Sequence, residues 1–254
     1  MFSSGLVSVT FRSLSPREIV ELCVSTGLTH LEWGGDKHVP PGDTARAREV
    51  AALTRDSGLT TLCYGSYYRC GGDDRNFEPI LEAAVELGAP RIRVWAGGGE
   101  DGAIFPRVLE DLERISDLAK AQSCEVVLEF HGGTLTHTGQ NARRLLDTGH
   151  GQFHSLWQPL RRTIGDEQIE ENLNELRLVA PFLKHVHVYE WHETDGGTQR
   201  NSLQGSKQWP RYIAELRALN LEVPLLLEFV PGDDSSVLAR EAGALKAMLE
   251  DSPR

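Results

Sequence analysis

A strand-like apolar run followed by a helix-like segment recurs along this 254-residue chain at a step of about thirty residues. The runs are LVSVTF (6–11), HLEW (30–33), TTLCYG (60–65), RIRVWAG (91–97), EVVLEF (125–130), FHSLWQ (153–158), HVHVYE (185–190) and PLLLEF (224–229). They are more continuously apolar than alternating, which is typical of parallel strands covered by helices. Eight units of this length close most naturally into a (β/α)8 TIM barrel.

The segments between the runs carry helix start and stop signals. Ser15 and Pro16 suit the N-cap and first position of a helix that ends at Gly27, and a later helix ends at Gly58. We therefore predict a single α/β barrel domain over residues 1–254. An open doubly wound sheet is the alternative, but no glycine-rich nucleotide-binding motif follows the first strand.

Composition excludes several classes of partner. The formal net charge is −11, which disfavours binding to nucleic acid or to an anionic membrane surface. No apolar run approaches the roughly 20 residues of a spanning helix, and the first residues do not resemble a secretory signal. The four cysteines show no paired spacing, as expected for reduced core thiols. We expect a cytoplasmic protein with a small-molecule partner, as a monomer or a homo-oligomer.

Two of the strand-like runs, VVLEF and LLLEF, close with a glutamate followed by Phe; the glutamates are Glu129 and Glu228. A buried, isolated carboxylate is costly, so these strand ends require compensation or a polar pocket. The carboxyl ends of barrel strands converge on one mouth. Gln158 and His187 are the polar residues at the corresponding positions of the two runs between them. Two carboxylates, an amide oxygen and an imidazole form a plausible divalent-metal site, which would offset the cost.

The sequences VVLEFHG, HVHV and LLLEF resemble the xylose-isomerase-like (β/α)8 superfamily, whose sugar branch includes hydroxypyruvate isomerases, ketose 3-epimerases and inosose dehydratases. LEWGGDKHVPPGD, RVWAG and WQP resemble its sugar phosphate isomerase/epimerase-like members. The resemblance implies that Glu129, His187 and Glu228 are three of four metal ligands. The fourth is usually the Asp of an Asp-x-x-His pattern, where this chain has Gln158 and Arg161. We expect one divalent ion, Mn²⁺ or Mg²⁺ first, with Co²⁺ and Zn²⁺ as alternatives.

These residues predict proton transfer beside a carbonyl. A divalent ion on the carbonyl stabilises an enediolate, and a carboxylate on each face can take and return the proton. We assign these catalytic roles to Glu129 and Glu228 and expect a sugar isomerase or epimerase. Leu135 stands where the ketose 3-epimerases have a second glutamate, which argues against that activity. An inosose-type dehydratase and a non-catalytic sugar-binding barrel remain alternatives; an abasic-site endonuclease is opposed by the acidic charge.

Further candidates at the predicted mouth are aromatic, imidazole and guanidinium side chains that could contact a sugar. They are Trp33, His38, Tyr64, Trp95, His131 and Arg200. Plain packing or turn formation is the alternative for each of them. Arg200 lies in a long polar insertion after the seventh strand, and long loops at this end of a barrel often act as lids. Phosphorylated and non-phosphorylated sugars both stay open as substrates, with a non-phosphorylated one favoured by the acidic chain.

Overall fold

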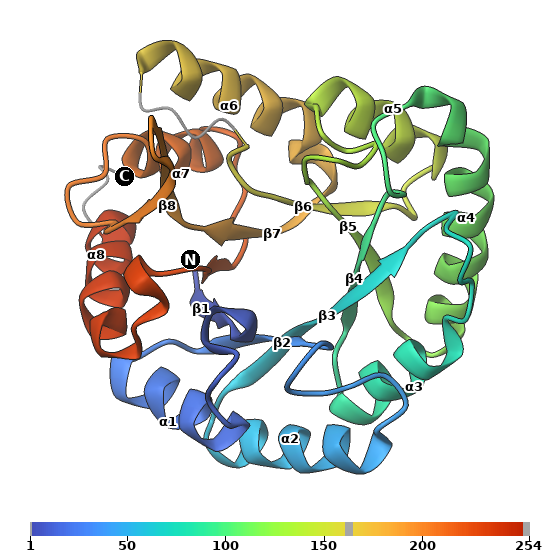
Figure 1. Ribbon diagram of the computed structural model, residues 1–254, viewed down its shortest axis with the longest axis horizontal. Coiled ribbons are helices and arrows are strands. Elements are labelled where there is room, and N and C mark those ends of the chain that lie inside the picture. Colours follow the sequence, from blue (N-terminus) through green and yellow to red (C-terminus); the bar gives the residue numbers. More distant parts are fainter. Residues whose placement is uncertain (1, 161–164, 251–254) are drawn as a thin grey trace.

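Eight parallel strands close into a barrel in the computed structural model of the chain, which describes residues 2–160 and 165–250 (Figure 1). Around the barrel, β1 to β7 follow chain order, and β10 closes the circle between β7 and β1. The barrel strands are β1 (Ser4–Val7), β2 (His30–Gly34), β3 (Thr60–Arg69), β4 (Arg91–Trp95), β5 (Glu125–Glu129), β6 (His154–Trp157), β7 (Leu183–Val188) and β10 (Leu225–Leu227). The predicted TIM barrel is confirmed.

Helices alternate with the strands and surround the barrel (Figure 1). They are α1 (Pro16–Thr26), α2 (Thr44–Asp56), α3 (Glu78–Leu87), α4 (Phe105–Ala121), α5 (Gly139–Thr148), α6 (Asp166–Val179), α7 (Trp209–Ala218) and α8 (Leu238–Glu250). Ser15 and Glu18 form a capping box before α1, and Gly27 ends that helix at φ 71°. Within the described residues, no helix combines the length and apolar character needed to cross a membrane.

Successive side chains of β2 and β3 point alternately toward the surrounding helices and toward the barrel interior. The Trp33 indole donates a hydrogen bond to the Thr54 hydroxyl on α2 (3.2 Å), and the Tyr64 hydroxyl donates to the Val39 carbonyl (2.8 Å). Both aromatic rings therefore pack outward. Glu32, one residue before Trp33, points inward, because successive strand residues face opposite sides.

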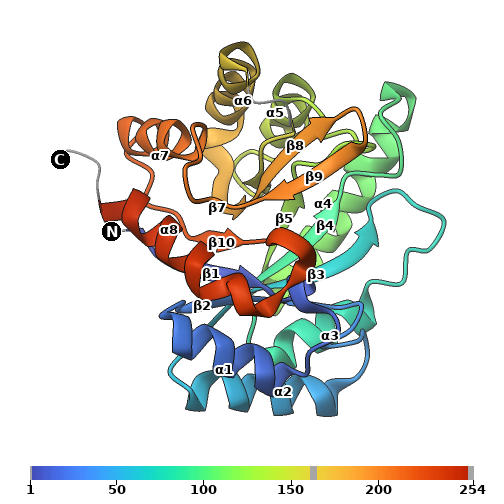
Figure 2. The same cartoon turned by 60° about the vertical axis from the view of Figure 1, so that its left-hand side comes forward.

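The insertion after β7 folds into an antiparallel hairpin of β8 (Glu190–Thr194) and β9 (Gly197–Asn201). Figure 2 shows this hairpin as a two-stranded sheet separate from the barrel. It follows β7 directly, so it stands at the end of the barrel where the carboxyl ends of the strands lie. Arg161, which occupies the position of the family's histidine, lies outside the described residues.

Asp111 on α4 anchors the loop after β3. Its carboxylate is buried and accepts hydrogen bonds from the Tyr68 hydroxyl (2.7 Å), the Gly71 backbone N–H (2.8 Å) and the Arg114 guanidinium (3.0 Å). Burial alone would raise the pKa of Asp111, but these donors hold it below its ordinary value. Asp111→Asn should lower the free energy of unfolding by about 2–3 kcal/mol at neutral pH, because charged hydrogen bonds are lost.

The loss of unfolding free energy in Asp111→Asn should be largest at neutral pH and should shrink as pH falls. A carboxyl group whose pKa is depressed in the folded state stabilises the protein above its unfolded pKa, and that contribution disappears as pH falls through the folded value. Denaturant unfolding of both proteins should therefore show curves that converge below about pH 4. Asp117→Asn, an exposed position on the same helix, is the matched control and should change stability by less than about 0.5 kcal/mol. Equal losses in the two variants would contradict the anchoring role.

Candidate active site

A cavity of about 590 Å³ opens at the carboxyl ends of the barrel strands. Glu129 ends β5, Gln158 follows β6, and Glu228 follows β10, so three strands of one side of the barrel direct polar side chains into it. The remaining wall contains charged and aromatic residues, among them Arg12, Tyr67, Arg93, Trp95, His131, Trp191 and Phe229. The structure thus brings together both glutamates that the sequence analysis assigned to catalysis.

Glu129 is held by donors on both carboxylate oxygens. Its Oε2 accepts from the Arg93 guanidinium and from the Trp95 indole N–H, and Arg93 also forms an ion pair with it. Its Oε1 accepts from the Gln158 side-chain amide (3.1 Å), which donates as well to the Phe130 carbonyl (3.0 Å). Because both neighbours of that amide are acceptors, the hydrogen-bond network places its nitrogen toward them. Gln158 therefore orients Glu129 in this arrangement.

A second group of polar side chains lies across the barrel interior. Glu32 Oε2 is 3.1 Å from His187 Nε2 and 3.2 Å from His185 Nε2, while Glu32 Oε1 is 2.9 Å from Arg93 Nε. The other ring nitrogen of His187, Nδ1, is 3.3 Å from Glu228 Oε2. Arg93 and His187 therefore connect Glu32 with the two glutamates of the cavity.

The charges of this network shift its proton affinities. Burial alone would raise the pKa of Glu32, but Arg93 and His187 hold it well below its ordinary range. Burial would lower the pKa of His187, yet the carboxylates of Glu228 and Glu32 raise it to about 10. His185, for which burial dominates, has its pKa lowered to about 4. At neutral pH, His187 thus carries a proton on both nitrogens when no metal ion replaces one, and His185 is neutral.

Sequence reasoning missed Glu32 and Arg93. Both occur inside otherwise apolar strand-like runs, HLEW and RIRVW, where a charged residue signals either a polar barrel interior or an exposed strand edge. Both are 3% exposed or less. Since isolated buried charges are rare, a charged residue in the middle of a predicted barrel strand was the available signal.

The predicted substrate-binding residues divide into two groups. Trp95 and His131 line the cavity, with their rings 5.3 Å apart. Trp33 and Tyr64 face the helix layer, and His38 is buried against Ser8 and the Leu14 carbonyl at 2.9 and 3.2 Å; none of these three is part of the cavity wall formed by described residues.

Arg200, on β9, lies beside the cavity. It forms an ion pair with Asp233, and its guanidinium carbon is 4.6 Å from the centre of the Phe229 ring. Its charge is therefore already compensated within the chain, and it contacts an aromatic wall of the cavity.

A family model described as xylose isomerase-like TIM barrel matches residues 20–248. The chain belongs to this family. The match spans every barrel strand except β1 together with the cavity residues from Arg93 to Phe229, so the expectation drawn from the strand-end motifs is confirmed. A comparison with curated protein sequences gave no match.

Solved structures share the fold at low sequence identity. The probable 3-DHS dehydratase AsbF of Bacillus anthracis has a TM-score of 0.75 and 18% identity, with 97% of this chain and 99% of that one covered. The 3-keto-D-glucoside 4-epimerase YcjR of E. coli has a TM-score of 0.71 and 17% identity, covering 98% and 99%. A xylose isomerase-like protein of Mycobacterium smegmatis in complex with magnesium has a TM-score of 0.70 and 15% identity, covering 98% and 96%.

Three of the predicted metal ligands lie in or next to the cavity: Glu129 and Glu228 line it, and His187 is next to Glu228. His187 Nδ1 is buried and has no hydrogen-bond partner among the described residues, although the Glu228 carboxylate is close. Its Nε2 faces Glu32, the arrangement in which a second carboxylate fixes the tautomer of a ligating histidine. An ion at Nδ1 would replace a proton. The ligand atoms of Glu129, His187 and Glu228 do not, however, all lie within 4.8 Å of one another among the described residues, and donors occupy both Glu129 oxygens. Their role as ligands therefore stays a prediction.

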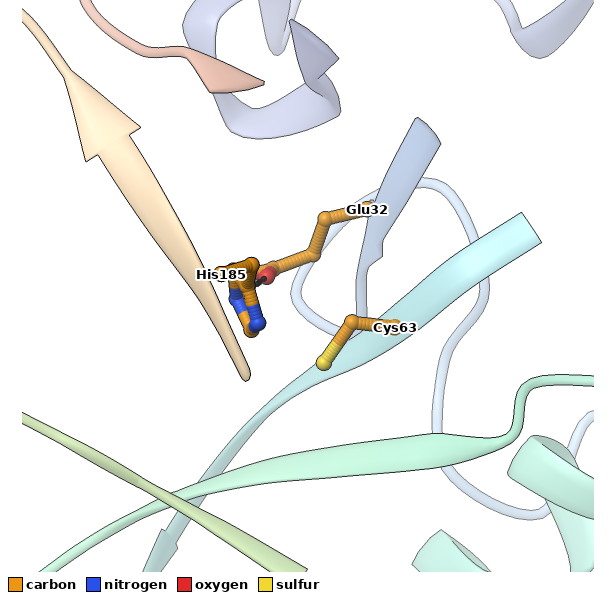
Figure 3. Close-up of side chains that lie close together, drawn as sticks. All are labelled: Glu32, Cys63 and His185. Atoms are coloured by element: carbon orange, nitrogen blue, oxygen red, sulfur yellow. Dashed lines mark hydrogen bonds and ion pairs between the residues drawn. The ribbon is translucent and has the colours of Figure 1, made fainter. Parts of the chain in front are cut away.

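A second trio of potential ligands lies in the barrel interior. Atoms of Glu32, Cys63 and His185 lie within 4.8 Å of one another, and Figure 3 shows the three side chains directed toward a common point. All three are fully buried. Burial raises the pKa of the Cys63 thiol well above its ordinary value, and Glu32 is already shared with Arg93 and histidine. This trio therefore has the short distances of a metal site, but its carboxylate is already paired and its thiol is held protonated.

Proposed function

We propose that this protein is an enzyme that isomerises or epimerises a small sugar or sugar derivative by moving a proton beside its carbonyl group. The observation that carries the proposal is the shared cavity of Glu129 and Glu228, with Arg93 of the neighbouring strand β4 paired to Glu129. Two carboxylates facing one substrate can remove a proton from a carbon and return it.

The contacts of the two glutamates favour different roles. Glu228 lines the cavity, and its near neighbour is the His187 ring, so it can approach a substrate C–H group as the base. Glu129 has donors on both oxygens; burial would raise its pKa, but the Arg93 charge lowers it, which keeps it ionised. Glu129 faces the cavity from β5, and these donors fix the orientation of its carboxylate.

Arg93 supplies a permanent positive charge to the cavity wall. The side chain is almost fully buried and is paired with Glu32 and Glu129. Its charge can stabilise a substrate oxygen electrostatically as that oxygen gains negative charge during proton removal. Bound Mn²⁺ or Mg²⁺ at Glu129, His187 and Glu228 would polarise the same carbonyl group.

The walls of the cavity suit a sugar ring. Trp95 and Tyr67 contact each other on one side, with ring centres 5.5 Å apart, and Trp191 packs on Phe229 at 5.1 Å. Flat aromatic faces pack well against the C–H groups of a sugar while its hydroxyl groups reach polar side chains.

Product analysis tests the proposal directly. The purified protein is incubated in D₂O with a panel of aldoses, ketoses, keto-glycosides and inososes, with and without Mn²⁺. An isomer or epimer with carbon-bound deuterium supports the proposal. Loss of water with formation of a C=C bond would instead assign the dehydratase activity, which uses the same first proton removal. Binding of a sugar without conversion would identify a binding barrel and contradict the enzymatic proposal.

Gln158 provides a prediction about metal affinity. Gln158→Asp should tighten Mn²⁺ binding by at least about tenfold, because it places a third carboxylate beside Glu129 and Glu228. Turnover should fall or stay unchanged, since added ligand charge reduces the polarising effect of the ion. Gln158→Ala should weaken Mn²⁺ binding by about tenfold, the lower end of the effect of a residue that orients a ligand, because the amide donates to Glu129 rather than ligating.

Calorimetric titration of chelator-treated protein with MnCl₂ measures these affinities. An affinity order of Asp, then Gln, then a much weaker Ala would show that Gln158 is itself a ligand. No uptake of Mn²⁺, Mg²⁺, Co²⁺ or Zn²⁺ by the native protein would refute the metal site.

A further inference from the structure

Glu228 and Phe229 are consecutive residues, yet both line the cavity. In a strand, successive side chains point to opposite faces. The Phe229 side chain also points into the cavity because its backbone has φ 52°, in the left-handed region that residues other than glycine rarely adopt. Glu228 keeps the inward direction of Leu226, two residues earlier, which packs in the barrel interior. The bend at Phe229 therefore fixes the backbone on the C-terminal side of Glu228.

Backbone hydrogen bonds fix this bend on both sides. The Glu228 N–H donates to the Val188 carbonyl of β7 (2.9 Å), which continues the pairing of the barrel. The Phe229 N–H donates to the hydroxyl of Thr10 (3.1 Å), a buried side chain that follows β1. Strained backbone persists only where its surroundings determine it, and such positions cluster at functional sites.

The Phe229 side chain is held by the β8–β9 hairpin. Its ring lies 5.1 Å from the Trp191 ring of β8, and the Arg200 guanidinium of β9 lies 4.6 Å from it and 5.3 Å from Trp191. Arg200 is in turn paired with Asp233, in the segment that follows Phe229. The arginine thus connects the hairpin with both sides of the bend.

We propose that Phe229 and Arg200 are positioning residues for Glu228: Arg200 holds Phe229 against the hairpin, and the resulting bend fixes the backbone that carries the Glu228 carboxylate. The inference rests on the proposed role of Glu228 as the base. Arg200 then acts through Phe229 and not through contact with the substrate. Because Arg200 connects the β8–β9 hairpin with Phe229, weakening this contact should displace Glu228.

Hydrogen exchange tests the coupling without any substrate. Arg200→Met should raise amide exchange in residues 225–234 by about tenfold, because the clamp on the bend is lost. Arg69→Met is the matched control: Arg69 lies 4.0 Å over the ring of Trp95, another wall of the cavity, and should leave exchange in residues 225–234 unchanged. Arg200→Lys keeps the charge and should restore most of the protection. Exchange in Arg200→Met equal to that of native protein would overturn the coupling.

Kinetics then tests the effect on the base once a substrate is known. Arg200→Met and Phe229→Gly should each lower kcat by about 100-fold, because a misplacement of about 1 Å has effects of this size. KM of Arg200→Met should change by less than about threefold, since Arg200 is not part of the cavity wall formed by described residues. Phe229→Gly also removes an aromatic cavity wall, so its KM should rise as well. A raised KM at native kcat would show that Arg200 binds substrate directly and would refute the positioning role. Failure of the native protein to convert any substrate would refute the proposed function, whereas the exchange result stands independently.

Discussion

Glu228→Gln is expected to lower turnover by about 10²–10⁴-fold while the barrel stays folded. Glutamine has nearly the same shape but cannot accept a proton from carbon. The side chain is 4% exposed and faces the cavity, and the backbone N–H stays bonded to Val188, so little structural change is expected. Steady-state kinetics with Mn²⁺ in excess separates the loss of the base from weaker metal binding, and circular dichroism confirms the fold.

Two further variants sharpen this result. Glu82→Gln, at an exposed glutamate of α3, should leave turnover unchanged and controls for the change of charge. Deuterium uptake into substrate from D₂O should disappear in Glu228→Gln together with turnover, because both require removal of the same proton. Full activity with undiminished exchange would remove Glu228 from the chemistry and leave Glu129 as the remaining carboxylate.

The architecture could be predicted because it depends on a property that a linear sequence carries well. Apolar runs at intervals of about thirty residues report the βα unit, and Gly27 and Gly88 adopt the left-handed conformation expected at helix ends. Closure into a barrel follows from the number of units. The long step before the last strand indicated an insertion but not its form, because the hairpin register depends on pairing within a polar segment.

The site could be predicted where a strand ends on a polar residue, and less well where the direction of a side chain had to be known. Equal spacing of strand ends suggested Trp33 and Tyr64 as mouth residues, yet both face outward. The register between β2 and β3 shifts beside Glu32, and a shift of one residue exchanges the inward and outward sets. The sequence contains no local signal for such a shift.

The interior network was inaccessible for a different reason. Glu32 contacts His185 and His187 across 153 and 155 positions of sequence, and Arg93 joins it from β4. Each residue by itself has an ordinary alternative explanation at the surface. Only closure of the barrel brings them together, so their roles follow from tertiary structure.

Arg93→Met is expected to lower the free energy of unfolding by about 3–5 kcal/mol, because it leaves two buried carboxylates, Glu32 and Glu129, without their guanidinium partner. Methionine fills much of the volume, so loss of charge dominates the effect. Denaturant unfolding in the presence of a chelator measures it without a contribution from bound metal. Arg91→Met is the control on the same strand: Arg91 is partly exposed and 3.5 Å from Glu125, and its loss should cost less than about 1 kcal/mol.

The pH dependence of this variant should differ from that of the native protein. In the native protein, the Arg93 charge helps to hold the pKa of Glu32 and Glu129 low, so both stabilise the fold above their unfolded pKa values. Without the guanidinium, burial should raise both pKa values. A group with a raised folded pKa stabilises the protein at low pH and loses that contribution as pH rises, so the deficit of Arg93→Met should be greater at pH 8 than at pH 5.

Adding Glu129→Gln should recover part of the loss at pH 8, because it removes one of the unpaired charges. A deficit that is independent of pH, or equal to that of Arg91→Met, would show that Arg93 is not the counter-charge of these glutamates.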